Sequence, residues 1–144
     1  MAHRESIQNE RLRDYIDSKF FYTVSQSVGY GCPNRSEDVR LVQYLINKFH
    51  QKKVLVTDGK YGGLTWNAIK KFQELHDIPK GAGTVSSANG IRWTSPKTGQ
   101  PYTICILNQY LKTYFDDIWS DPRKDPWFPK ELWSHLWGPL PQIA

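Results

Sequence analysis

Apolar residues recur at helical spacing in three separate segments of the chain. The stripes run through residues 36–49, 65–76 and 101–118. Their members are Val39, Val42, Leu45 or Ile46, and Phe49; Trp66, Ile69 and Phe72; and Ile104, Leu107 or Cys105, Leu111, Phe115 and Ile118. Steps of three and four residues place each set on one helical face. The pattern therefore predicts a mainly α-helical fold with a compact three-helix core.

Local signals set the ends of these helices. Ser36 is a favourable N-cap, and Glu37 and Asp38 favour the positive end of a helix dipole. The second helix should end by His76, because the residue before Pro79 avoids the α region. A short β-prone run at residues 54–56 leads from the first helix toward the second.

A tight turn is expected directly before the second helix. Asp58-Gly59 is a turn dipeptide, and Gly62 and Gly63 permit positive φ. Thr65 then follows as the expected N-cap. Together these residues predict a helix whose entry angle is set by the turn.

The segments around the core are expected to be extensions and loops. Residues 4–20 carry apolar side chains roughly on one helical face, which predicts an amphipathic N-terminal helix. Residues 21–28 alternate and are β-prone. Glycines and prolines predict a long loop at residues 77–100, in which residues 91–94 fit one short strand of a hairpin.

The C-terminal extension is too apolar for a solvated linker. It contains Trp127, Phe128, Trp133 and Trp137 between prolines. Such an extension either wraps back on the core or presents a docking surface, and the sequence leaves both open. We expect three parts: an N-terminal helical extension (1–23), a central domain (24–119) and a C-terminal extension rich in Trp and Pro (120–144).

Composition and charge narrow the class of protein. The 144 residues, 39% of them hydrophobic, suffice for one domain whose core needs no disulfide. The net charge of +5 suits an anionic partner, but the basic residues are scattered, which argues against nucleic acid. No apolar run reaches the roughly 18 residues of a membrane helix. Cys32 and Cys105 lie in unrelated segments; their pairing stays open, and two buried free thiols are expected.

Three motifs follow one another along the chain: Asp38-Val39-Arg40-Leu41-Val42-Gln43-Tyr44-Leu45, Asp58-Gly59-Lys60-Tyr61-Gly62-Gly63-Leu64-Thr65 and Ala68-Ile69-Lys70-Lys71-Phe72-Gln73. In this order they resemble the bacterial peptidoglycan-binding domain that accompanies many cell-wall hydrolases. The resemblance covers about residues 24–118 and implies a three-helix fold whose second turn repeats the first. Asn89-Gly90 and Thr103 are the candidates for that second turn and its cap.

Most motif positions are interpreted as structural. Turn, cap and core roles account for Asp58, Gly59, Gly62, Thr65 and Phe72, and Asp38 belongs to the first helix. Gln43 and Gln73 follow buried residues and are expected to hydrogen-bond loop backbone. A weaker resemblance joins Val28-Gly29-Tyr30-Gly31 and Asn34 to versions of the domain in proteobacterial phage and contact-dependent secretion proteins.

The resemblance implies that the protein binds the glycan or the stem peptide of peptidoglycan. Tyr61, Trp66 and Asn67 around the turn, and Trp93 in the long loop, are the candidate ligand-binding residues. They combine flat aromatic area with an amide donor and acceptor. Packing is the alternative role for each of them.

No catalytic or metal-binding pattern stands out, and no cofactor is expected. Gly31-Cys32 only faintly resembles the nucleophile motif of L,D-transpeptidases, and no flanking pattern supports it. The four histidines lack metal-ligand spacing. A carboxylate pair for glycan cleavage stays open, because the separation of two carboxylates is a spatial quantity.

The sequence thus predicts non-catalytic binding of bacterial cell-wall peptidoglycan, as part of a phage, toxin or secretion-associated system. The first alternative is a protein-interaction (adaptor, immunity or accessory) protein that reuses the fold, with the Trp-rich extension as a docking surface. A small cell-wall hydrolase is the third. Charged residues follow the N-terminus where a signal peptide has an apolar core. We therefore expect a cytoplasmic protein, or one that reaches the periplasm by lysis or specialised secretion.

Overall fold

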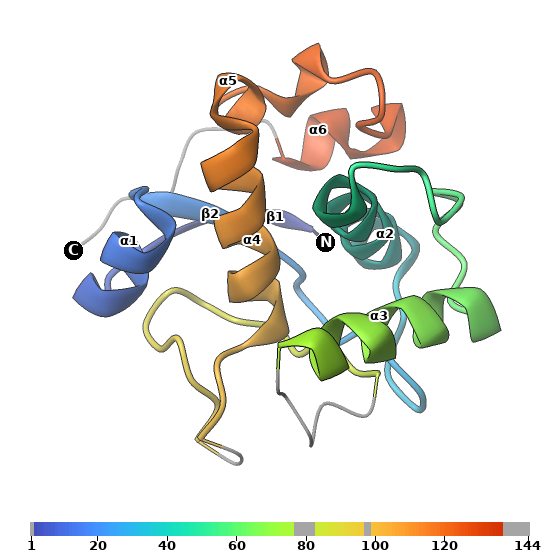
Figure 1. Cartoon of the computed structure of the whole chain (residues 1–144), viewed down its shortest axis with the longest axis horizontal. Coiled ribbons are helices and arrows are strands. Elements are labelled where there is room, and N and C mark those ends of the chain that lie inside the picture. The colour runs from blue at the N-terminus through green and yellow to red at the C-terminus, as the bar shows by residue number, and fades with distance from the viewer. Residues whose placement is uncertain (1, 77–82, 97–98, 137–144) are drawn as a thin grey trace.

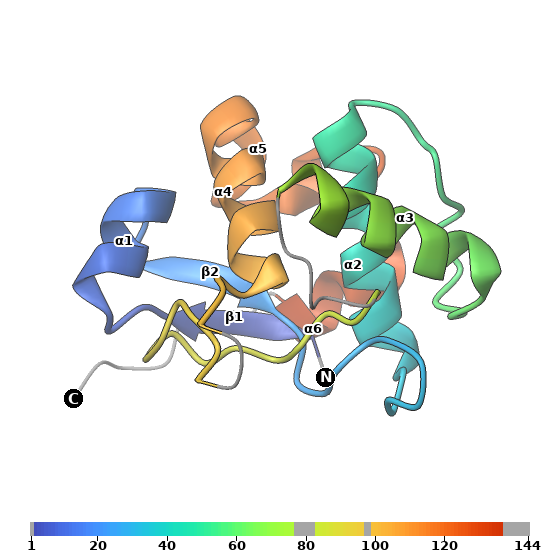
Figure 2. The same cartoon turned by 60° about the horizontal axis from the view of Figure 1, so that its bottom comes forward.

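Helix α4 (Thr103–Tyr114) lies at the centre of the fold. In the computed structural model, which describes residues 2–76, 83–96 and 99–136, α4 contacts α2 (Ser36–His50) on one side and α1 (Glu10–Ile16) on the other (Figure 1). Strand β2 packs against it as well (Figure 2). The other elements are β1 (His3–Ser6), β2 (Phe20–Thr23), α3 (Gly63–Leu75), α5 (Asp116–Trp119), η1 (Pro122–Lys124), η2 (Lys130–Leu132) and α6 (Trp133–Leu136).

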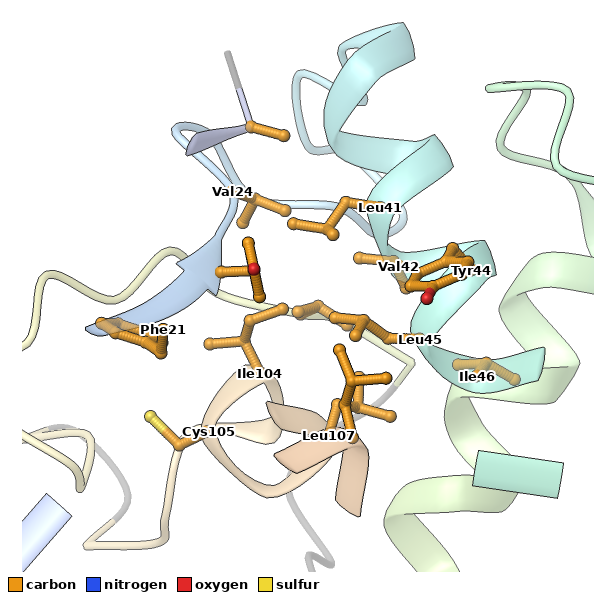
Figure 3. Close-up of a cluster of buried hydrophobic side chains, with 14 of the residues drawn as sticks. Phe21, Val24, Leu41, Val42, Tyr44, Leu45, Ile46, Ile104, Cys105 and Leu107 are labelled. Atoms are coloured by element: carbon orange, nitrogen blue, oxygen red, sulfur yellow. The ribbon is translucent and has the colours of Figure 1, made fainter. Parts of the chain in front are cut away.

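The main hydrophobic core forms where α2, α4 and β2 meet. Figure 3 shows Ile104 and Leu107 of α4 pointing toward Leu45 of α2, with Phe21 of β2 at the edge of the cluster. All four side chains are at most 1% exposed. Burying a side chain of this size contributes about 1.5–3 kcal/mol, so contacts far apart in the sequence hold the helices together.

The structure confirms the first two predicted helices. α2 spans Ser36–His50 and α3 ends at Leu75, with His76 as its C-cap. Val42, Leu45, Ile69 and Phe72 belong to one buried cluster, as their spacing predicts. The third predicted helix, by contrast, is broken. α4 ends at Tyr114, and Phe115 has a non-helical backbone (φ −136°, ψ 46°) before the short helix α5 begins.

The prediction of one helix through residues 4–20 is wrong. Only Glu10–Ile16 is helical, while His3–Ser6 and Phe20–Thr23 pair as antiparallel strands, with Arg4 opposite Tyr22. Trp119 fixes this hairpin to α5: its ring stacks on Phe20 (centroids 5.3 Å apart) and its Nε1 donates to Ser18 Oγ (2.9 Å). His3–Ser6 is a strand because it pairs with Phe20–Thr23, and its own hydrophobic pattern does not predict a strand.

The long loop before α4 makes single bridges, and its described residues, 83–96 and 99–102, form no continuous strand. Val28 pairs with Val85, and Thr94 pairs with Pro101. The Thr94–Pro101 bridge lies at the predicted hairpin, but residues 91–94 form no strand. The part of the predicted loop at residues 77–82 lies outside the described residues.

The described part of the C-terminal extension packs on the core. Phe128 and Leu132 are 5% and 0% exposed, and the ring of Phe128 meets that of Tyr44 edge to face at 5.0 Å. Trp133 is 40% exposed. Trp137 lies outside the described residues.

A buried ion pair ties this extension to α2. Lys48 Nζ lies 2.8 Å from Asp125 Oδ2, and the Tyr44 hydroxyl donates to the same oxygen at 2.8 Å. The Lys48 ammonium also sits 4.0 Å from the ring centroid of Phe115 and 4.8 Å from that of Trp127. Burial, together with the Asp125 carboxylate, raises the pKa of Tyr44, so its hydroxyl stays a donor at all ordinary pH values.

Phe72→Ala is expected to lower the free energy of unfolding by about 3–5 kcal/mol, because it leaves a cavity at a fully buried position. Leu75→Ala, in the same helix but 63% exposed, is the control and should change it by less than about 0.5 kcal/mol. Urea denaturation measures both. A loss below about 1 kcal/mol for Phe72→Ala would remove this residue from the core.

Asp125→Ala should lower the free energy of unfolding by about 3–5 kcal/mol, because it leaves the Lys48 ammonium buried without its partner. Asp116→Ala removes the exposed partner of Lys112 and should cost less than about 1 kcal/mol. Equal losses in the two variants would show that the Lys48–Asp125 pair does not hold the extension.

The two cysteines should differ in reactivity. Both are free; Cys105 is buried, whereas Cys32 is partly exposed, contrary to the expectation that both are buried. Burial raises the pKa of the Cys105 thiol to about 12, and the thiolate is the reactive form. Titration with Ellman's reagent at pH 8 should label Cys32 rapidly, and Cys105 only after denaturation. Rapid labelling of two thiols in the native protein would contradict this assignment.

Candidate functional site

The turn before α3 is held by one buried amide from α2. Gln43 is 1% exposed, and its Nε2 donates to Asp58 Oδ1 (3.1 Å), the Lys60 carbonyl (3.2 Å) and Thr65 Oγ1 (3.2 Å). Its Oε1 accepts from the Gly59 N–H (3.0 Å). The predicted bond from Gln43 to loop backbone is thus confirmed. The Lys60 N–H and Gln43 Nε2 both donate to Asp58 Oδ1, and these hydrogen bonds lower the pKa of the Asp58 carboxyl.

The positive φ of the turn occurs at Gly59, not at the glycine pair. Gly59 has φ +75°, and a Cβ there would lie 2.4 Å from Ser36 Oγ. Gly62 has an extended backbone (φ −147°), and Gly63 is the first residue of α3. The prediction that Gly62 and Gly63 supply positive φ is therefore wrong. Both glycines are exposed, and a Cβ on either would meet open space.

Both predicted N-caps lie inside their helices. Arg35 and Gly62 are the capping residues, and neither makes a side-chain cap bond. Thr65 is only 3% exposed, and its hydroxyl accepts from Gln43 rather than from the first turn of its own helix. Ser36 is the first residue of α2 and lies against Gly59.

A second buried amide repeats this arrangement on α3. Gln73 Nε2 donates to the Thr84 carbonyl (2.7 Å) and to Thr103 Oγ1 (3.1 Å), and its Oε1 accepts from the Gly83 N–H (2.9 Å). Gly83 has φ +78°, close to that of Gly59. Gln73 thus bonds to a glycine N–H, a loop carbonyl and a threonine hydroxyl, as Gln43 does. The second turn therefore lies at Gly83.

The assignment of the second turn to Asn89-Gly90 is therefore wrong. The Gly90 carbonyl instead accepts from the N–H groups of Gln8 and Asn9, both at 3.0 Å, just before α1. A Cβ at Gly90 would lie 2.2 Å from the Ser6 carbonyl oxygen. This glycine permits close contact between the long loop and the N-terminal segment.

Trp66 lies between the two turns. It belongs to the first part of α3, and a Cβ on Gly83 would lie 2.5 Å from its Cδ1. Lys70 Nζ sits 4.8 Å from its ring centroid. The ring is thus held between the second turn and Lys70, and it stays partly exposed.

The loop before α2 brings Tyr30 to the same surface. Asp38 is fully buried and accepts from the N–H groups of Ser25 and Gln26 at 3.2 Å, which fixes the start of this loop. Asn34 closes it, because its side-chain amide both accepts from and donates to the backbone of Gly29 at 2.8 Å. Tyr30 stands between these contacts and is 88% exposed.

These segments together form an open groove of about 630 Å³, which we call the aromatic groove. Its lining is Tyr30, Tyr61, Gly62, Gly63, Trp66 and Thr84. Gly62 and Gly63 place it at the start of α3. That end of the helix lies on the side of the molecule away from α1 (Figure 1). Burial raises the pKa of the Tyr61 phenol. Its hydroxyl oxygen is buried, so Tyr61 contributes its ring to the lining of the groove.

The structure brings two of the four candidate ligand-binding residues together. Tyr61 and Trp66 line the aromatic groove. Asn67 does not line it; it lines a neighbouring hollow with Lys70 and Glu74, which Trp66 also lines. Trp93 packs on Tyr15 of α1, with ring centroids 5.2 Å apart, and does not line the groove.

Sequence reasoning missed Tyr30 as a ligand-contacting candidate. Gly29 and Gly31, which flank Tyr30, indicate a loop, but the local sequence does not show which surface of the protein that loop reaches. The two bonds from Asn34 to Gly29 set that direction.

Among the described residues, the lining of the groove contains no carboxylate, histidine or cysteine. Its side-chain hydroxyls are those of Tyr30, Tyr61 and Thr84. The Cys32 thiol lies 3.8 Å from the Tyr30 carbonyl, and in the described part of the chain no histidine interaction with it is seen. His3 pairs with Glu5 at 2.8 Å, whereas His50 and His76 pack on Phe49.

The described residues form neither a metal-binding cluster nor a membrane-spanning helix. No cluster of three or more His, Cys, Asp or Glu side chains arranged to hold a metal ion occurs among them. None of the helices they form combines the length and apolar character of a membrane span.

Comparison with known proteins identifies one segment. Residues 35–80 match the family model described as "Putative peptidoglycan binding domain". No curated protein and no solved structure matches the chain. The matched segment contains α2, the Gln43 turn and α3, which carry the three motifs of the sequence resemblance. Residues 35–80 therefore match the family that those motifs resemble.

Proposed function

We propose that this protein binds bacterial cell-wall peptidoglycan through the aromatic groove and does not cleave it. The observation that carries the proposal is the position of the groove: four of its six lining residues lie within the segment that matches the family. The exposed ring of Tyr30 and the partly exposed rings of Tyr61 and Trp66, beside backbone amides and a threonine hydroxyl, suit a sugar ring, which has apolar faces and polar edges.

The rigidity of the groove supports this function. Trp66 is held by Gly83 and Lys70, and the Gln43 turn precedes it. A site that is formed before its ligand arrives loses less conformational entropy on binding. Tyr30 is the exposed ring of the set and is expected to stack on a bound sugar.

We also propose that α2, α3 and α4 form a three-helix unit of this family, which the N-terminal hairpin and the C-terminal extension complete. The binding is proposed to serve a phage, toxin or secretion-associated system. Its support is the loop with Gly29, Tyr30 and Asn34, which resembles the versions of the domain in such systems and which carries Tyr30 into the groove. Gene neighbours that encode lysis or secretion components would test this context.

The purified protein should co-sediment with peptidoglycan sacculi and release no soluble fragments. Tyr30→Ala and Trp66→Ala should each weaken binding by about tenfold, or about 1.4 kcal/mol, because each removes a ring from the groove. Tyr114→Ala, which removes another exposed tyrosine on α4, is the matched control and should bind like the wild type.

Sodium chloride must be varied in this assay, because a protein of net charge +5 attracts anionic wall material without specific contacts. Binding through the aromatic groove should persist at high salt. Loss of all binding at high salt, or equal binding by Trp66→Ala and the wild type, would refute the proposal. A fall in turbidity with release of fragments would instead indicate a hydrolase.

A further inference from the structure

A second groove adjoins the aromatic groove and differs from it in chemistry. Its volume is about 300 Å³, and it shares Gly62 and Gly63 with the aromatic groove. The apolar part of its lining consists of Val54, Leu55, Val56 and Leu64, without any aromatic ring, and Gln43, Asp58, Lys60 and Thr65 complete it. We call it the aliphatic groove.

Exposed hydrophobic side chains gather around these two grooves. Val54, Val56 and Leu64 are 44%, 77% and 80% exposed, and Tyr30 is 88% exposed. These are four of the eight large hydrophobic residues that are exposed in the described part of the chain. Single exposed apolar residues are ordinary, but such a concentration along adjoining hollows marks a binding surface.

The fold does not need these aliphatic side chains for its own stability. Leu55, between the two valines, is buried, and the Asn47 amide accepts from its N–H and donates to its carbonyl at 2.9 Å. Gln43 holds the next part of the loop at Gly59 and Lys60. The loop is therefore fixed by α2, and Val54 and Val56 point outward on either side of its anchor.

Lys60 adds a positive charge to this lining. The Asp58 carboxylate accepts from Gln43 Nε2 and from the Lys60 N–H inside the turn. Among the described residues, the Lys60 ammonium makes no ion pair within 4.0 Å. The aliphatic groove thus offers small apolar surfaces beside one cation and one carboxylate, which complement a short peptide that has methyl side chains and groups of both charges.

We propose that the aliphatic groove binds the stem peptide of peptidoglycan while the aromatic groove binds the sugar from which that peptide branches. This inference rests on the proposed wall binding and divides it between two subsites. A flat ring prefers aromatic walls, whereas alanine-type methyl groups fit between valine and leucine side chains. The shared backbone of Gly62 and Gly63 lets one branched ligand pass from one subsite to the other.

Two soluble preparations of the same glycan test this division. Sacculi cut by an endopeptidase yield strands that keep their stem peptides, and sacculi treated with an N-acetylmuramoyl-L-alanine amidase yield strands without them. Titration calorimetry should show that the wild type binds the peptide-bearing strands at least about tenfold more tightly. Equal affinity for both preparations would overturn the assignment of the aliphatic groove.

Variants separate the two subsites. The double variant Val56→Ser/Leu64→Ser should lose about tenfold in affinity for peptide-bearing strands and bind bare strands like the wild type. Trp66→Ala should lose affinity for both. Leu75→Ser, at the other end of α3 and 63% exposed, is the control and should change neither. Circular dichroism and thermal melting confirm that each variant is folded.

The outcomes distinguish this inference from the proposed function. Wild-type binding to both preparations with equal affinity would refute the peptide subsite and keep wall binding. An unchanged affinity of Val56→Ser/Leu64→Ser for peptide-bearing strands would likewise refute the subsite. Failure of the wild type to bind either preparation would refute wall binding and this inference together.

Discussion

Buried side-chain amides on the helices hold the long connections of this protein in place. Gln43, Asn47, Gln73 and Asn108 are each at most 2% exposed, and each uses its oxygen to accept from a backbone N–H and its nitrogen to donate to a backbone carbonyl. A buried amide left without partners costs about 1–3 kcal/mol, so each connection is strongly favoured in the one arrangement that satisfies its amide. This matters here because the connections are long and form little regular structure of their own. Loss of one such bond pair would release a whole segment, whereas loss of one core methyl group would only loosen local packing.

The grooves follow directly from two of these amides. Gln43 sets the turn that carries Tyr61 and Lys60, and Gln73 sets the turn at Gly83 against which Trp66 rests. The walls of the aromatic groove are therefore fixed by contacts inside the protein. Both amides also reach a threonine hydroxyl at the start of the next helix, so each joins two helices and the turn between them. Binding surface and fold thus depend on the same residues, and substitutions at Gln43 or Gln73 cannot separate the two effects. Tyr30, Val56 and Leu64 offer that separation, because they are exposed and make no comparable internal bonds.

Local patterns predicted α2, α3 and the bonds from Gln43 and Gln73 to loop backbone, because helical spacing and buried amides are properties of short segments. Features that depend on distant contacts were predicted poorly. His3–Ser6 is a strand only because Phe20–Thr23 lies beside it, and its sequence is mostly polar. Asn89-Gly90 is the stronger turn dipeptide, yet the second turn lies at Gly83 because Gln73 reaches that N–H. Of the candidate ligand-binding residues, Tyr61 and Trp66 meet in one groove, while Trp93 packs on Tyr15. The spacing of residues in the sequence does not show which distant side chains come into contact in the fold.

The match to the peptidoglycan-binding family covers residues 35–80, but the packing shows that these residues depend on the rest of the chain. α2 buries Val42 and Leu45 against Ile104 and Leu107 of α4, which lies outside the match (Figure 3). Its Lys48 is paired with Asp125 of the C-terminal extension at a position only 7% exposed. Gln73 requires Thr84 and Thr103 for its hydrogen bonds. A fragment limited to the matched residues would expose that apolar face and leave the ammonium of Lys48 without its buried partner. The matched residues therefore pack as part of a larger unit that includes α4 and Asp125 of the C-terminal extension, and the wall-binding surface proposed here is a property of that unit.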